Sequence, residues 1–138
     1  MKKTLSIILS FVAFYHIIIG LIGIFFKDYA VWAAKTFFSF NLTMSPQIEW
    51  ILNPFAAYIL IFGVFMAVAA TNPEKYKNII MVGVVLFAIR IIQRLIFIFS
   101  ASDALKSIAS STQNIIHIII VAIIGAAMLG LTMKLSQK

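Results

Sequence analysis

The chain contains no cysteine, which excludes disulfides, thiolate metal sites, thiol catalysis and covalent haem attachment. Acidic residues are also scarce: there are four (Asp28, Glu49, Glu74 and Asp103), and none lies inside a long apolar run. Hydrolysis by a pair of carboxylates is therefore disfavoured. Because no metal-ligand spacing, nucleophile elbow or phosphate-binding loop is present either, we expect the protein not to be an enzyme.

What the chain does contain is apolar sequence. Hydrophobic residues make up 63% of its 138 residues and charged residues 11%, too little polar surface for a water-soluble protein. The apolar runs are continuous, without the two-residue alternation of barrel strands, so they predict membrane helices. We expect an all-α, integral-membrane four-helix bundle that forms one domain over residues 1–138. Its predicted spans are about Thr4–Phe26, Trp50–Ala70, Asn78–Phe99 and Asn114–Leu135, each near the ~20 residues that cross a bilayer.

The lysines flank these runs and predict the orientation. The net charge is +7, and the excess lies at both termini and in the turn TNPEKYKN, whereas acidic residues balance the lysines of the other connections. The positive-inside rule therefore places both termini in the cytoplasm. The composition favours a bacterial inner membrane. Nucleic-acid binding is not expected, because no soluble basic patch is available to phosphates.

The connection between the first two spans carries two local patterns. Residues 28–40 predict a short amphipathic helix whose aromatic side chains lie in the outer membrane interface. Those aromatic residues are Tyr29, Trp32, Phe37 and Phe38. Residues 41–43 match a glycosylation sequon, which has little weight in a sequence of bacterial character. Further on, Asn53-Pro54 predicts the start of a helix, with asparagine as cap and proline in the first turn.

Arg90 and Arg94 are the only charged residues well inside an apolar run. A cation at membrane depth costs at least about 2.5–3.5 kcal/mol unless it is paired or solvated. The two arginines lie one helical turn apart, and their planar forks suit an anion such as a lipid phosphate or carboxylate, or a polarisable carbonyl. The alternative is structural: pairing with loop carboxylates (Glu49, Asp28 or Asp103) or backbone carbonyls, or Arg94 extending to the outer surface.

The other polar residues of the spans fall in the same half of the membrane. At about 1.5 Å rise per residue, Arg90 and His16 both lie about 15 Å from the outer end of their spans, Arg94 and Gln93 about 9 Å, and Asn53 and His117 about 5 Å. Small residues share faces with these polar ones and predict helix contacts. A polar pocket that opens outward and is closed below by apolar residues is therefore expected. Its predicted ligand-binding residues are Arg90, Arg94, Gln93, His16, His117, Asn53, Tyr15 and Tyr58.

His16 and His117 allow a second interpretation, axial ligation of haem b, with the arginines beside the propionates. Their predicted depths differ by about 10 Å, which is poor geometry for one iron. Interhelical hydrogen bonds or a proton relay are the other roles open to them. We expect no resident cofactor or metal.

The length and the four-span pattern resemble small bacterial membrane proteins of the DoxX-like and BphX-like kind. This resemblance implies an accessory role in the inner membrane, linked to redox or catabolic systems, and assigns no functional residue. The expected function is binding of an anionic or carbonyl-bearing amphiphile, a lipid or a quinone, in the outer-half pocket. Two alternatives stay open: an assembly subunit or homo-oligomer whose arginines pair with partner carboxylates, and a small transporter.

Overall fold

The computed structural model describes residues 1–38, 40, 43–102, 106 and 109–136. These residues form helices α1 (Lys2–Phe25), α2 (Lys27–Phe38), α3 (Pro46–Thr71), α4 (Lys77–Ser100) and α6 (Ser111–Ser136). Apart from one isolated bridge, between Phe40 and Ala109, the described part of the chain contains no β structure. Helices α1, α3, α4 and α6 are long and apolar enough to cross a membrane. The prediction of an all-helical, multi-pass membrane protein is confirmed at this level.

Helices α1 and α4 match their predicted spans to within about two residues at either end, whereas α6 begins about three and α3 about four residues before its predicted start. Ser45 is the N-cap of α3, and its hydroxyl accepts a hydrogen bond from the amide of Ile48 at 3.3 Å. Pro46 follows in the first turn, where its fixed φ suits a helix start. The predicted start at Asn53-Pro54 was wrong, because the Ser45-Pro46 pair supplies the same start signals earlier and Pro54 lies inside the helix.

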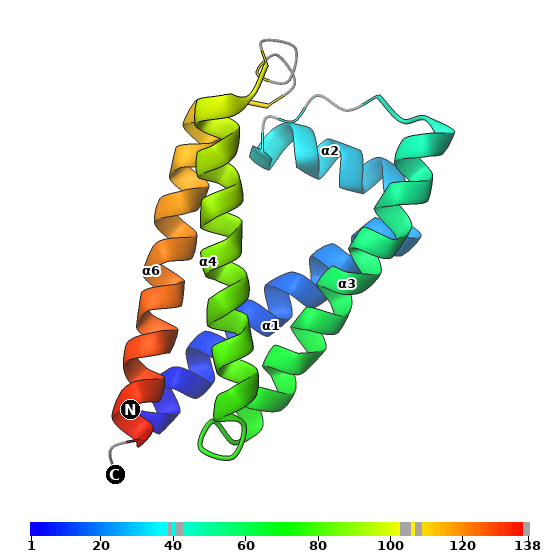
Figure 1. Cartoon of the computed structure of the whole chain (residues 1–138). Coiled ribbons are helices and arrows are strands. Elements are labelled where there is room, and N and C mark those ends of the chain that lie inside the picture. Colours follow the sequence, from blue (N-terminus) through cyan, green and yellow to red (C-terminus); the bar gives the residue numbers. More distant parts are fainter. Residues whose placement is uncertain (39, 41–42, 103–105, 107–108, 137–138) are drawn as a thin grey trace.

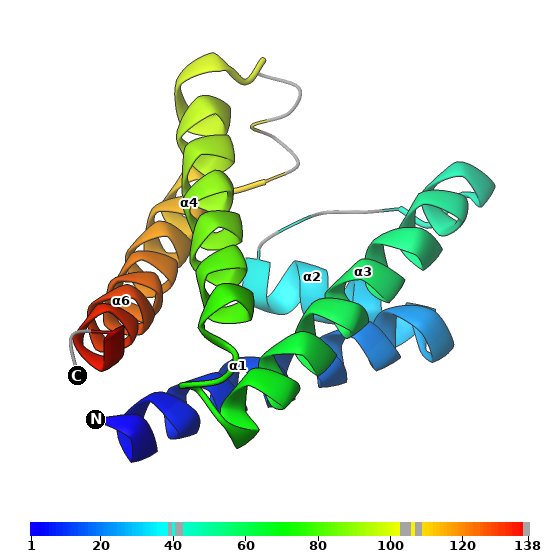
Figure 2. The same cartoon turned by 60° about the horizontal axis from the view of Figure 1, so that its bottom comes forward.

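The long helices are arranged as two pairs. Figures 1 and 2 show α1 running beside α3, and α4 beside α6. Glycines bring the backbones of α1 and α3 close together: a Cβ atom added at Gly63 would lie 2.8 Å from the amide nitrogen of Ile17, and one at Gly20 would lie 2.7 Å from that of Leu60. The prediction that small residues mark a helix contact is confirmed for this pair.

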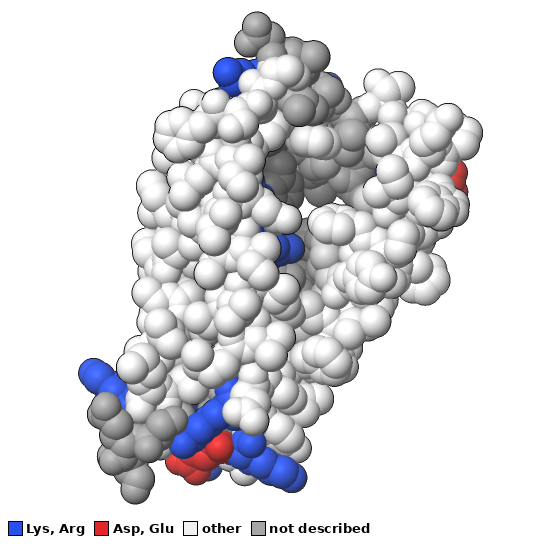
Figure 3. All heavy atoms as spheres, in the orientation of Figure 1, with Lys and Arg blue, Asp and Glu red and all other residues white. Residues whose placement is uncertain are grey.

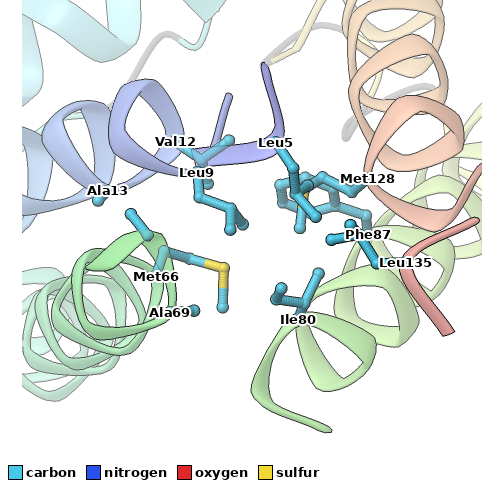
Figure 4. Packing of buried hydrophobic residues seen from close by; sticks show 11 residues of the cluster. Leu5, Leu9, Val12, Ala13, Met66, Ala69, Ile80, Phe87, Met128 and Leu135 are labelled. Carbon is cyan, nitrogen blue, oxygen red and sulfur yellow. The ribbon is translucent and has the colours of Figure 1, made fainter. Parts of the chain in front are cut away.

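The two pairs meet at the end of the molecule that holds both termini (Figure 1). All four long helices contribute side chains to a buried cluster there, shown in Figure 4. The cluster includes Leu5, Leu9, Met66, Ala69, Ile80, Phe87, Met128 and Leu135. At the same end Lys2 forms a 3.0 Å ion pair with Glu74, and the Lys77 ammonium donates to the carbonyl of Leu135 at 3.1 Å.

Toward the other end the pairs diverge, and α2 lies across the space between them (Figures 1 and 2). An ion pair between Lys27 and Glu49 joins the start of α2 to the first turn of α3. Beyond the other end of α2, Phe40 pairs with Ala109 of the α4–α6 connection. The short helix predicted between the first two spans is confirmed, although the Phe38 side chain and most of the sequon lie outside the described part. The bundle arrangement is not confirmed, because the helix pairs separate.

Candidate functional site

Three aromatic rings lie between the two pairs, where the pairs begin to separate. The imidazole of His16 on α1 lies edge-on to Phe62 of α3, with ring centroids 4.7 Å apart, and 6.3 Å from Phe87 of α4 in a stacked arrangement. Phe62 and Phe87 are 6.0 Å apart. We call these three residues the aromatic floor. Figure 3 shows a hollow between the two pairs, with basic side-chain atoms in its wall.

Arg90 lies one helical turn from Phe87 and contacts the floor through His16. One guanidinium nitrogen, Nη1, lies 3.2 Å from Nε2 of His16. The other ring nitrogen, Nδ1, lies 2.7 Å from the carbonyl oxygen of Val12. A carbonyl only accepts and a guanidinium only donates, so Nδ1 carries the proton and Nε2 accepts from Arg90. His16 is 4% exposed and is therefore a buried, neutral imidazole that orients the arginine.

Arg94 is held differently, within the α4–α6 pair. Its Nη1 donates to Oδ1 of Asn114 at 2.5 Å. The amide nitrogen of the same Asn114 side chain donates to the carbonyl of Ser110 at 3.0 Å, which fixes the orientation of the asparagine. Arg94 therefore has a preset neutral acceptor on α6, just as Arg90 has one on α1.

Neither arginine is paired with a carboxylate of the described residues. The two ion pairs found there involve lysines, Lys2 with Glu74 and Lys27 with Glu49. Glu49, one of the expected structural partners, is therefore engaged by Lys27 at the junction of α2 and α3 rather than beside an arginine. Asp103, another, lies outside the described part. Two positive charges within the membrane-spanning part thus have neutral partners in the structure.

The structure brings together some of the predicted site residues and separates others. Tyr15 packs edge-on against His16, at 5.2 Å between ring centroids, and its side chain is 42% exposed. Gln93, Asn53 and Tyr58 are exposed side chains, and Tyr58 is 71% exposed. The site that forms is smaller than the predicted one: Tyr15, His16, Arg90 and Arg94.

His117 is partly buried, and its Nδ1 lies 2.7 Å from the carbonyl of Gln113 in its own helix. Asn114 and Phe62 were not among the predicted site residues. Asn114 is a polar residue at the start of a predicted span, and this was the available signal. Phe62 had no signal, because a phenylalanine in an apolar run is not distinctive.

Both ring nitrogens of His16 have partners, Nδ1 with the Val12 carbonyl and Nε2 with Arg90, so iron ligation would require Nε2 to release the arginine. The haem interpretation stays a prediction. Within the described residues no group of three or more His, Cys, Asp or Glu side chains is placed to hold a metal ion.

A separate open cavity of about 460 Å³ lies at the corner between α1 and α2, lined by residues 24–29. None of the polar residues of the spans lines it. We therefore place the candidate site at the arginines rather than in this cavity.

No protein-family model, curated protein or solved structure matches the chain. The resemblance to DoxX-like and BphX-like proteins thus stays a prediction.

Proposed function

We propose that this small membrane protein binds the polar head of an amphiphile, a lipid or a quinone, in the hollow between its two helix pairs. The observation that carries the proposal is that, among the described residues, Arg90 and Arg94 pair with neutral acceptors only. Desolvated cations without counter-charges are costly in a bilayer, and an anionic or carbonyl-bearing head supplies the missing acceptor. The apolar tail would lie along the exposed aliphatic side chains of the diverging helices.

Orientation and location form part of the same proposal. The lysine-rich end with both termini would face the cytoplasm of a bacterium, and α2 would lie in the outer interface with its exposed Tyr29 and Trp32. The hollow would then open toward the outer leaflet, from which an amphiphile can enter sideways between the pairs. An accessory rather than catalytic role fits the lack of a nucleophile, a carboxylate pair or a metal group among the described side chains near the arginines.

Native mass spectrometry of the full chain in mild detergent tests this function. We expect the wild type to retain an amphiphile, and Arg90→Leu and Arg94→Leu to lose it. Lys35→Leu, which removes an exposed cation of α2, is the control and should retain it. Unchanged adducts in both arginine variants would contradict amphiphile binding at this site.

The second candidate is an assembly subunit, favoured by the same lack of carboxylates. Carboxylates of a partner, or of a second copy of the chain, would then neutralise the arginines. A stable, arginine-dependent oligomer that carries no bound amphiphile would support this candidate over the first. Transport is the third, and it requires arginine-dependent flux into vesicles.

A further inference from the structure

We infer that the amphiphile is one whose head is a phosphate monoester, carrying nearly two negative charges, rather than a phosphodiester lipid or a quinone. This inference rests on the proposed function and specifies its ligand. It follows from the number of positive charges at the site, the geometry of the two guanidiniums and the neutrality of their neighbours.

The charge of the site selects the charge of the head. Arg90 and Arg94 bring two positive charges, whereas the side chains that contact them, His16 and Asn114, bring none. A phosphate monoester carries about −1.5 to −2 at neutral pH. It therefore neutralises the site almost completely. A phosphodiester or a fatty acid leaves one cation uncompensated within the bilayer, and a quinone carbonyl leaves both.

The geometry allows one phosphate to reach both forks. Side chains four residues apart on a helix have Cβ atoms about 5–6 Å apart, so a single group placed between Arg90 and Arg94 is within reach of both long side chains, although their present acceptors lie on α1 and α6. Each guanidinium has five N–H donors, and the hydrogen bonds seen within the described part use one on each. The neutral acceptors therefore hold the two forks in place and leave donors for the three terminal oxygens of a phosphate monoester.

The surroundings favour a lipid over free phosphate. Arg90 contacts His16 of the aromatic floor, and Phe87 of the floor belongs to the buried apolar cluster that closes the inner half. The exposed aliphatic side chains of the diverging helices offer nothing to a hydrated ion, whereas they suit an acyl or prenyl chain. The shared chemistry is the phosphate monoester, and the tail distinguishes the two sources.

The test uses the full chain in nanodiscs of phosphatidylcholine and compares three lipids with identical acyl chains. These are phosphatidic acid (a monoester), phosphatidylglycerol (a diester) and additional phosphatidylcholine as the zwitterionic reference without net charge; inorganic phosphate is the tail-free competitor. We expect phosphatidic acid to bind about tenfold more tightly than phosphatidylglycerol, because it gains one further charge-assisted contact. Inorganic phosphate at millimolar concentration should not displace it.

Arg90→Gln and Arg94→Gln should each remove this preference, whereas Lys35→Gln should keep it. Arg94→Lys is a milder variant for use if the glutamine variants unfold: it keeps the charge but loses the fork, and the preference should fall. Equal, arginine-dependent binding of phosphatidic acid and phosphatidylglycerol would overturn the monoester inference and leave amphiphile binding intact. Displacement by inorganic phosphate would overturn the lipid as its source. Absence of any arginine-dependent binding would overturn both proposals.

Discussion

Arg90 of α4 donates a hydrogen bond to Nε2 of His16 on α1, at 3.2 Å, and so links the two helix pairs at the point where they begin to separate. Two other polar contacts stay within one pair: Arg94 with Asn114 joins α4 to α6, and, nearer the termini, Ser6 with the carbonyl of Ala70 joins α1 to α3. The Arg90–His16 contact therefore sets both the position of a cation and the spacing of the pairs.

The first prediction concerns this contact. His16→Leu leaves the Arg90 guanidinium without its acceptor, and we expect it to lower stability by about 1–3 kcal/mol. Arg90→Leu leaves Nε2 without a donor. The double variant removes both polar groups and should be more stable than the sum of the single effects predicts, with a coupling of about 0.5–3 kcal/mol. Thermal unfolding in one detergent measures all four proteins.

Tyr58→Phe serves as the control for that cycle, because its hydroxyl belongs to an exposed side chain and should not matter. Additive single effects would show that the Arg90–His16 bond contributes nothing to joining the pairs.

The second prediction concerns the contact between α1 and α3. Gly63→Ala introduces a methyl group 2.8 Å from the backbone nitrogen of Ile17, so the helices must move apart. We expect a loss of about 1–3 kcal/mol, the usual effect of overpacking. Gly130→Ala is the matched control, because a Cβ atom added there meets nothing within 4 Å. Denaturation in mixed micelles compares the two, and equal stabilities would contradict the close approach of α1 and α3.

The third prediction concerns the start of α3. Ser45→Ala removes the side-chain acceptor of the Ile48 amide and should cost about 1 kcal/mol, whereas Ser45→Asn should preserve the cap. Asn53→Ala should change stability by less than about 0.5 kcal/mol, because Asn53 is an exposed residue inside the helix. Thermal unfolding distinguishes the two positions. A larger effect at Asn53 than at Ser45 would favour the helix start expected from the sequence.

The fourth prediction concerns orientation. Because the natural chain has no cysteine, single substitutions can be labelled without background. A membrane-impermeant maleimide added outside intact cells should label Lys35→Cys on α2, and should label Lys3→Cys only after the membrane is permeabilised. Both positions are exposed. The reverse pattern would place the lysine-rich end outside.

The four spans were predictable because length and hydropathy are local properties, and each apolar run is long enough to cross a bilayer. Helix ends were less predictable, since Ser45-Pro46 lies outside the apolar run and contributes nothing to its hydropathy. The alignment of Arg90 with His16 in depth also followed from the sequence, because helical rise converts residue number into height.

The partners in the site needed the tertiary structure. Arg94 contacts Asn114 because α4 lies beside α6. The spacing of residues in the sequence does not predict which helices are neighbours. The predicted pocket included Asn53 because it shares a helical face with small residues of its span, and Tyr58 because its hydroxyl can donate, but both prove to be exposed. The divergence of the helix pairs could not be predicted from hydropathy either. An apolar side chain has the same hydropathy whether it faces lipid or another helix.

That divergence has a consequence for the bilayer itself. A protein that is narrow at the end carrying its termini and broad at the end carrying α2 occupies more area in one leaflet than in the other, so it acts as a cone among the lipids. In the proposed orientation the outer leaflet gains the larger area, and membrane that bulges outward should accommodate the protein best. Protein labelled with one fluorophore and inserted with α2 outward should thus be enriched in small vesicles over large ones, and an even distribution would contradict the cone shape.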